Sequence, residues 1–250
     1  MITYEYPFNE LVRSLLRLEY LFDRFNYYVE KDDARDMHQA ISIIFDLGEI
    51  TARADLKSSL MKELDRQKNS LESLKNQKGV DQSLLNSTLQ EMNVIWQKIN
   101  NTIGKPNSLI TDSEWLNAIR TRLSVPGGTS PIDLHSYHAW QYIPAETRRN
   151  SLKSYMAPLE PWNEASSMFL RLLRESGQQM EMMAPKGSYQ QMLSGKVYQL
   201  MRIHVEDPRI IPEISANKYM LWARFMDCDG VSKPKPIADD FGFKMSLCNF

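Results

Sequence analysis

The residues best suited to binding chemistry lie near the C-terminal end of the chain, between Ile214 and Met226. Successive side chains of a β-strand point to opposite faces of a sheet. With that period, one face of this stretch presents an apolar row suited to a core: Tyr219, Leu221, Ala223 and Phe225. The other face alternates cations with large, polarisable side chains: Lys218, Met220, Trp222, Arg224 and Met226. The sequence therefore predicts a strand whose outer face binds a partner.

Other predicted strands add positive charge to this surface. Arg202 and His204 fall on the expected outer side of a second strand, and Lys244 on that of a third. Residues 178–250 hold nine Lys and Arg against eight Asp and Glu, but the acids fall mostly at predicted turns. We therefore expect a local basic patch. A solvated sheet face, whose lysines prevent edge-to-edge pairing, explains the same pattern, and both interpretations stay open.

Motifs typical of enzymes are absent from the sequence. The chain has no phosphate-binding loop, dinucleotide glycine fingerprint, HExxH zinc motif or GxSxG nucleophile elbow. His135 and His138, beside Asp133, have a spacing that metal ligands can have. Residues three apart point to opposite faces of a strand, however, and we predict a strand over 138–143. We interpret these histidines as one surface and one half-buried residue, and we expect no catalysis, metal or cofactor.

The composition is that of a globular protein. With 250 residues, 42% hydrophobic and 24% charged, the chain can bury a sizeable core. A net charge of -1 gives no overall attraction to nucleic acid or to anionic lipid. Cys228 and Cys248, outside any CxxC spacing, favour a reducing compartment. Because we find no signal peptide and no apolar run of ~20 residues, we expect a cytoplasmic protein without membrane insertion.

The first half of the chain is predicted to be entirely helical. Apolar residues recur with the period of a helix over about 9–29, 33–48, 55–76 and 82–100. Thr111 and Glu114 have the spacing of a capping box, which predicts a short helix over 115–123.

The pattern changes after this block. Residues 124–131, SVPGGTSP, favour turns because proline fixes φ and glycine permits positive φ. The predicted strand over 138–143 and helices near 145–156 and 161–176 follow. From Gln178 onward, three runs alternate apolar and polar residues, which is typical of an antiparallel sheet with one wet face.

The predicted fold class is therefore α+β. We expect an all-helical domain over residues 1–123. A mainly antiparallel β-rich domain over residues 124–250 follows, with two helices packed on its sheet.

Short segments along nearly the whole chain resemble one known family, ZapD, a group of bacterial cell-division factors. The segments occur in the family's order: EYPFNE at 5–10, RLEYL at 17–21, LMKELDRQ at 60–67, GVDQ at 79–82, RTRLSVPGG at 120–128, PEIS at 212–215 and RFM at 224–226.

This resemblance implies a helical domain followed by a β-rich one and a symmetric homodimer. It also implies binding to the C-terminal tail of FtsZ, the tubulin-like GTPase of the division ring at midcell, and bundling of its filaments. The family's basic tail-binding pocket maps onto Arg224 in the β-rich part and Arg53 in the helical part. A further arginine of that pocket is replaced by Met220 in this chain, so Lys218 or Arg202 would have to supply the charge.

The resemblance and the basic strand face together predict a non-enzymatic, dimeric crosslinker. A peptide tail would lie along the face from Lys218 to Arg224, with Trp222 and Met220 packing against its apolar side chains. The alternative is a nucleic-acid-binding α+β domain that uses the same cations. Neutral overall charge and the lack of a basic helix argue against it.

Overall fold

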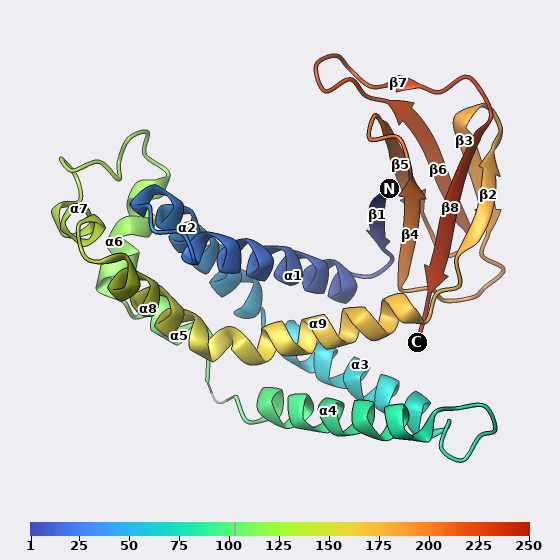
Figure 1. The fold of residues 1–250 in the computed structure, drawn as a ribbon, viewed down its shortest axis with the longest axis horizontal. Helices are drawn as coiled ribbons and strands as arrows, with labels where there is room; N and C mark the ends of the chain where they lie inside the picture. Colours follow the sequence, from blue (N-terminus) through green and yellow to red (C-terminus); the bar gives the residue numbers. More distant parts are fainter. Residues whose placement is uncertain (103) are drawn as a thin grey trace. The chain divides into compact units, whose positions relative to one another are not determined.

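The computed structural model describes residues 1–102 and 104–250. Helices occupy most of the N-terminal half and antiparallel sheets the C-terminal part, which confirms the predicted α+β class (Figure 1). The chain forms two compact units, which are described separately below. The helical unit comprises Ser14–Met168, and the β unit comprises Met1–Arg13 together with Phe169–Phe250.

The helices follow the predicted apolar periods closely. They are α1 (Glu10–Val29), α2 (Ala34–Thr51), α3 (Ala54–Glu72), α4 (Gln82–Asn100), α5 (Ser108–Thr111), α6 (Glu114–Leu123), α7 (His135–Gln141), α8 (Ala145–Met156) and α9 (Glu160–Glu175), with a 3-10 turn at Ala157–Leu159. The stripe of α1 is buried at Leu15, Leu18 and Phe22. Helices α3 and α4 pack against each other as a hairpin (Figure 1).

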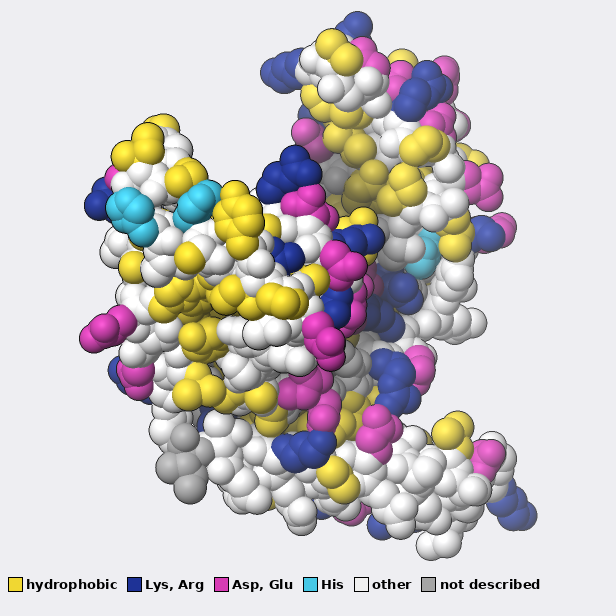
Figure 2. All heavy atoms as spheres, turned by 60° about the vertical axis from the view of Figure 1, so that its left-hand side comes forward, with side chains coloured by type: hydrophobic (Ala, Val, Ile, Leu, Met, Phe, Trp, Pro, Cys, Tyr) yellow, Lys and Arg dark blue, Asp and Glu magenta, His cyan; other side chains and the backbone are white. Residues whose placement is uncertain are grey.

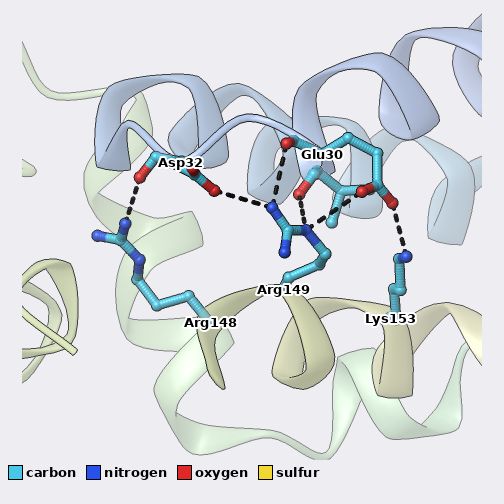
Figure 3. A network of polar contacts seen from close by, with 6 residues as sticks. Glu30, Asp32, Arg148, Arg149 and Lys153 are labelled. Atoms are coloured by element: carbon cyan, nitrogen blue, oxygen red, sulfur yellow. Dashed lines mark hydrogen bonds and ion pairs between the residues drawn. The ribbon is translucent and has the colours of Figure 1, made fainter. Parts of the chain in front are cut away.

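Helix α8 holds the end of α1 through a network of cations (Figure 3). Arg149 donates to the backbone carbonyl of Glu30 at 3.1 Å and pairs with the Asp32 carboxylate at 2.9 Å. Lys153 pairs with the Glu30 carboxylate at 2.6 Å, and this hydrogen bond lowers the pKa of Glu30. Arg148 is buried and donates to the carbonyl of Asp32. Arg149 also donates to the carbonyl of Val29, the last residue of α1, at 3.2 Å, and so gives a partner to a carbonyl that has none within the helix.

The β unit contains two antiparallel sheets. Its strands are β1 (Ile2–Pro7), β2 (Met180–Ala184), β3 (Ser188–Met192), β4 (Leu200–Val205), β5 (Ile210–Ala216), β6 (Met220–Asp227), β7 (Lys235–Pro236) and β8 (Phe241–Cys248), with a 3-10 turn at Pro185–Gly187. The first sheet has the order β1-β4-β8-β2, and the second has the order β3-β6-β5, with β7 paired to the end of β6. Both sheets contribute apolar residues to one core, among them Ile203 and Met245 from the first and Leu221 and Phe225 from the second. The predicted antiparallel pairing is confirmed, but the prediction of a single sheet was wrong, because the strands form two sheets that each turn one face to the core.

The N-terminal strand was missed by the sequence prediction. In β1, Ile2, Tyr4 and Tyr6 pack against the core while Glu5 pairs with Arg202 across the strands. The alternation is clear in retrospect. Its partner strand β4 lies about two hundred positions later in the chain, so local pattern gave no sign of pairing.

Residues 138–143 were predicted to form a strand, and this was wrong. They belong largely to helix α7. Tyr137 and Trp140, one helical turn apart, are both buried, and their rings stack with centroids 5.8 Å apart. A helix buries both aromatics on one side, whereas a strand would separate them. The capping box was also misplaced, because Ser113 caps α6 by accepting from the backbone N–H of Leu116.

The two units divide the chain differently from the predicted domains 1–123 and 124–250. Both unit boundaries fall inside long helices, α1 and α9, rather than in the turn-rich segment 124–131. Helix α8 packs against α2 and belongs to the helical unit. Turn composition marks a change in local structure, but it does not show which elements share a core. Whether residues 1–123 and 124–250 fold independently stays a prediction.

Candidate functional site

Strand β6 separates an inner from an outer face largely as the sequence predicts. Leu221 and Phe225 have no exposed surface and belong to the core between the sheets. Met220 and Trp222 are half-buried, and Arg224 is exposed. These three side chains lie on the outer face of the second sheet because they alternate with the core residues.

Strands β3 and β5 flank this face and complete a hollow of about 320 Å³ around it. Arg224 is paired across the strands with Ser188 on one side and Glu213 on the other. Trp222 is paired with Gln190 and Ser215 in the same way. All of these residues line the hollow, which we call the Arg224 face.

The Arg224 face combines a free cation with an apolar surface. Within residues 1–102 and 104–250, no hydrogen bond or ion pair of the Arg224 guanidinium is found. Glu213 is the acid directly across the strands, and such an exposed neighbour contributes at most ~1 kcal/mol. A guanidinium binds a carboxylate through paired N–H donors, and an indole ring packs against apolar side chains. The arrangement therefore suits a peptide that carries both.

Two residues of the predicted strand lie on the other side from the one expected. Tyr219 was predicted in the core row, but it precedes β6 and is 64% exposed. Met226 was predicted on the outer face, but it is buried between Ile211 of β5 and Pro236 of β7. The short strand β7 could not be foreseen, since only two of its residues pair.

Lys218 does not lie on the Arg224 face. It sits in the turn between β5 and β6, where Asn217 Oδ1 accepts hydrogen bonds from the backbone N–H groups of Tyr219 and Met220, both within 2.9 Å. This turn interrupts the alternation before Met220. Lys218 Nζ instead lies 5.6 Å from the centroid of the Tyr219 ring.

Arg202 lies on the outer face of the other sheet, where its charge is already compensated. Its Nε donates to Glu5 Oε1 at 3.0 Å, and Arg174 of α9 holds the same carboxylate through two hydrogen bonds of 2.8 Å. The Arg202 and Glu5 side chains are only 26% and 17% exposed. His204, also predicted on the outer side, is buried on this sheet and hydrogen-bonded to Thr3. The structure therefore does not join Arg202 to Arg224 on one surface.

Arg53 belongs to the helical unit, at the N-cap position of α3. Its Nη1 donates to Ser14 Oγ at 3.4 Å, and its Nε lies 3.8 Å from an Asp55 carboxylate oxygen. Its side chain is 40% exposed.

The histidines considered as metal ligands lie on α7. His135 and His138 share one side of this helix, contrary to the strand interpretation. His138 packs edge-on against Tyr142 with ring centroids 5.1 Å apart. Among residues 1–102 and 104–250, no group of three or more His, Cys, Asp or Glu side chains could hold a metal ion.

Sequence reasoning missed the residues that β3 and β5 contribute to the Arg224 face. Glu213 and Ser215 alternate with the inward-facing Ile214, so the period itself could have identified them. Gln190 gave no signal, because nothing in the segment 188–192 indicates which strand it joins.

One side of the surface is electrostatically mixed. On the side shown in Figure 2, Lys and Arg are interspersed with Asp and Glu and form no continuous basic track. Among the residues that the structure describes, no helix is both long and apolar enough to cross a bilayer.

Comparison with known proteins agrees with the resemblance seen in the sequence segments. The ZapD family, described as a cell division protein, matches residues 16–224. The protein of Ralstonia pickettii named "Cell division protein ZapD" is 48% identical over 252 aligned positions, covering 100% of both chains. The protein of the same name from Ralstonia nicotianae is 47% identical, again over the full length of both chains. The chain therefore belongs to the ZapD family of cell division proteins.

Proposed function

We propose that this protein binds the C-terminal tail of FtsZ through the Arg224 face and, as a homodimer, crosslinks FtsZ filaments at the midcell division ring in the cytoplasm. The observation that carries the proposal is the uncompensated, exposed Arg224 beside the half-buried Trp222 in an open hollow. Membership of a cell-division family supports a role in division. The proposed action is binding rather than catalysis.

The face supplies modest affinity for a peptide with acidic and apolar residues. An exposed ion pair contributes ~0–1 kcal/mol, so Arg224 alone gives weak binding. Packing on Trp222 and Met220 adds apolar burial. Together these contacts fit an affinity on the order of micromolar, or about -8 kcal/mol.

Weak sites become effective through valency. A filament displays many tails, and a symmetric dimer presents two copies of the face. Once one tail is bound, the second binding event occurs at high local concentration. Dimerisation is thus part of the proposed mechanism.

Some of the other predicted site residues are part of the proposed tail contact, and others are not. Met220, at the start of β6, lies on the outer side of the sheet next to the Arg224 face and would supply apolar packing in place of a charge. Arg53, in the helical unit, is proposed as a second cation for the tail. Lys218 lies outside the face, and Arg202 is ion-paired with Glu5 on the other sheet, so neither is part of the proposed contact.

Co-sedimentation of polymerised FtsZ with the protein tests the proposal. The wild-type protein should pellet with filaments and bundle them, while Arg224→Ala should lose most of this activity and keep its oligomeric state. Lys233→Ala, which removes an exposed cation elsewhere in the β unit, is the matched control and should behave as wild type. Equal pelleting of Arg224→Ala and wild type would overturn the role of the face, and no pelleting of the wild type at low salt would overturn the function.

A further inference from the structure

A second hollow opens at one end of the β unit, where the two sheets separate. Its volume is about 300 Å³. Three segments line it: the end of β1 with Tyr6 and Phe8, the loop Leu193–Tyr198 and the turn Ala216–Lys218. None of these residues belongs to the Arg224 face. We call it the lysine-rimmed hollow.

Aromatic rings form its floor. Tyr6 and Phe8 meet edge to face with centroids 5.6 Å apart, and Tyr198 approaches Phe8 at 6.5 Å. All three are half-buried, so part of each ring faces the opening. At the rim, Val197 is 74% exposed. Uncovered apolar surface of this kind gains free energy when a ligand covers it.

The walls are preformed by backbone geometry. Ser194 and Gly195 both adopt positive φ, at 49° and 74°, and the Lys196 N–H closes their turn onto the Leu193 carbonyl at 2.9 Å. On the opposite side, the Asn217 side chain fixes the turn that presents Lys218. A ligand would therefore pay little ordering entropy at these walls.

The rim carries positive charge that the fold does not neutralise. Lys196 and Lys218 are both exposed, and the hollow has no acidic lining residue. Within the described part of the chain, neither ammonium group has an ion pair. The Lys218 ammonium lies over the ring of Tyr219, 5.6 Å from its centroid. The site thus combines an apolar floor with two available cations.

We propose that the lysine-rimmed hollow binds an acidic peptide segment, at a site separate from the Arg224 face. A leucine or phenylalanine of the peptide packs on the aromatic floor, and flanking carboxylates pair with Lys196 and Lys218. A peptide fits better than a nucleic acid because single-strand binding requires a groove of cations that follows several phosphates, and here there are two lysines.

Fluorescence anisotropy with three labelled peptides tests the site. The probe is GDDLFDDG, and its controls are GNNLFNNG, which lacks charge, and GDDAADDG, which lacks the large apolar residues. The probe should bind several-fold tighter than either control. The double substitution Lys196→Gln/Lys218→Gln should weaken binding about tenfold, since each exposed pair contributes up to ~1 kcal/mol. Lys233→Gln/Lys235→Gln, which removes two exposed cations of the same unit, should leave it unchanged.

The outcomes separate this site from the FtsZ proposal. Because the probe could also occupy the Arg224 face, the comparison is repeated in the Arg224→Ala protein, where the probe should still bind and Lys196→Gln/Lys218→Gln should still weaken that binding, whatever the effect of Arg224→Ala on bundling. Equal affinity of GNNLFNNG and the probe, or no loss in the Lys196→Gln/Lys218→Gln protein, would overturn the proposal. Tighter binding of a labelled oligo-dT than of the probe, lost in the same double variant, would assign the hollow to nucleic acid instead.

Discussion

The two sheets of the β unit each carry an arginine on the outer face, and the two arginines differ in whether they have an ion-pair partner. On the β1-β4-β8-β2 sheet, Arg202 and Arg174 share the carboxylate of Glu5, and all three side chains are largely buried. On the β3-β6-β5 sheet, Arg224 is exposed and has no ion pair or hydrogen bond in the described structure. Both arginines occupy similar positions in the sequence pattern. What distinguishes a structural cation from one available to a partner is whether the fold supplies its counter-ion.

The largest expected effect is a loss of stability, and it should differ between the inner and outer faces of β6. Phe225 is fully buried, with its ring 4.6 Å from that of Phe243 and 4.8 Å from that of Phe241, measured between centroids. Phe225→Ala should lower the free energy of unfolding by about 3–5 kcal/mol through lost burial and a cavity. Trp222→Ala, on the outer face, should cost much less stability but weaken tail binding. Urea unfolding and tail binding of both variants test this, and a larger loss of stability for Trp222→Ala would show that the faces are misassigned.

The next effect concerns the compensated arginines. Glu5→Gln keeps the side-chain volume but leaves Arg174 and Arg202 without their shared negative charge. Removing one partner of a buried ion pair costs 3–5 kcal/mol, and partial exposure here reduces the expected loss to about 2–3 kcal/mol. Chemical denaturation measures it. Arg224→Ala is the control and should change stability by no more than about 0.5 kcal/mol. A loss below that value for Glu5→Gln would mean that the first sheet does not depend on this pairing.

The smallest expected effect is the response to pH. Burial, together with the nearby charge of Arg202, lowers the pKa of His204 below its ordinary value. Because the folded protein then binds this proton less readily than the unfolded chain, stability falls as the pH drops below about 6.5. His204→Gln should reduce this loss of stability between about pH 7.5 and 5.5. Tail binding should be the same in His204→Gln and in the wild type, because His204 lies on a different sheet from Arg224. An unchanged pH profile in His204→Gln would contradict this role for His204.

The sequence predicts the helices well because their apolar stripes are long and local. Leu15, Leu18 and Phe22 of α1 are buried as their spacing indicates. It also identifies the inner row of β6 and the exposed Arg224. Pairing between distant segments is not available from local pattern. Because β1 is not predicted, the sequence does not indicate that Glu5 pairs with Arg202. Arg202 and Arg224 then both look like unpaired cations on the outer face of a strand.

Hydrogen bonds within turns are a second feature that the strand period does not predict, and they change which residues belong to the site. Asn217 ends the alternation on which the assignment of Lys218 depended, through hydrogen bonds that the strand period does not represent. The two-residue pairing of β7 likewise buries Met226. The sequence therefore indicates which side chains can bind, while the backbone pairing decides which of them share a surface.

The most direct test compares Arg224→Ala with Arg202→Ala in binding to an FtsZ C-terminal tail peptide, by isothermal titration calorimetry under conditions where both proteins are folded. We expect Arg224→Ala to weaken binding about fivefold to tenfold, in keeping with loss of one exposed charge contact and its packing. Arg202→Ala should weaken it less than about twofold, because Arg202 is already ion-paired with Glu5 on the other sheet. An equal or greater loss for Arg202→Ala would contradict the central claim that, of these two sheet arginines, Arg224 is the one that serves the partner.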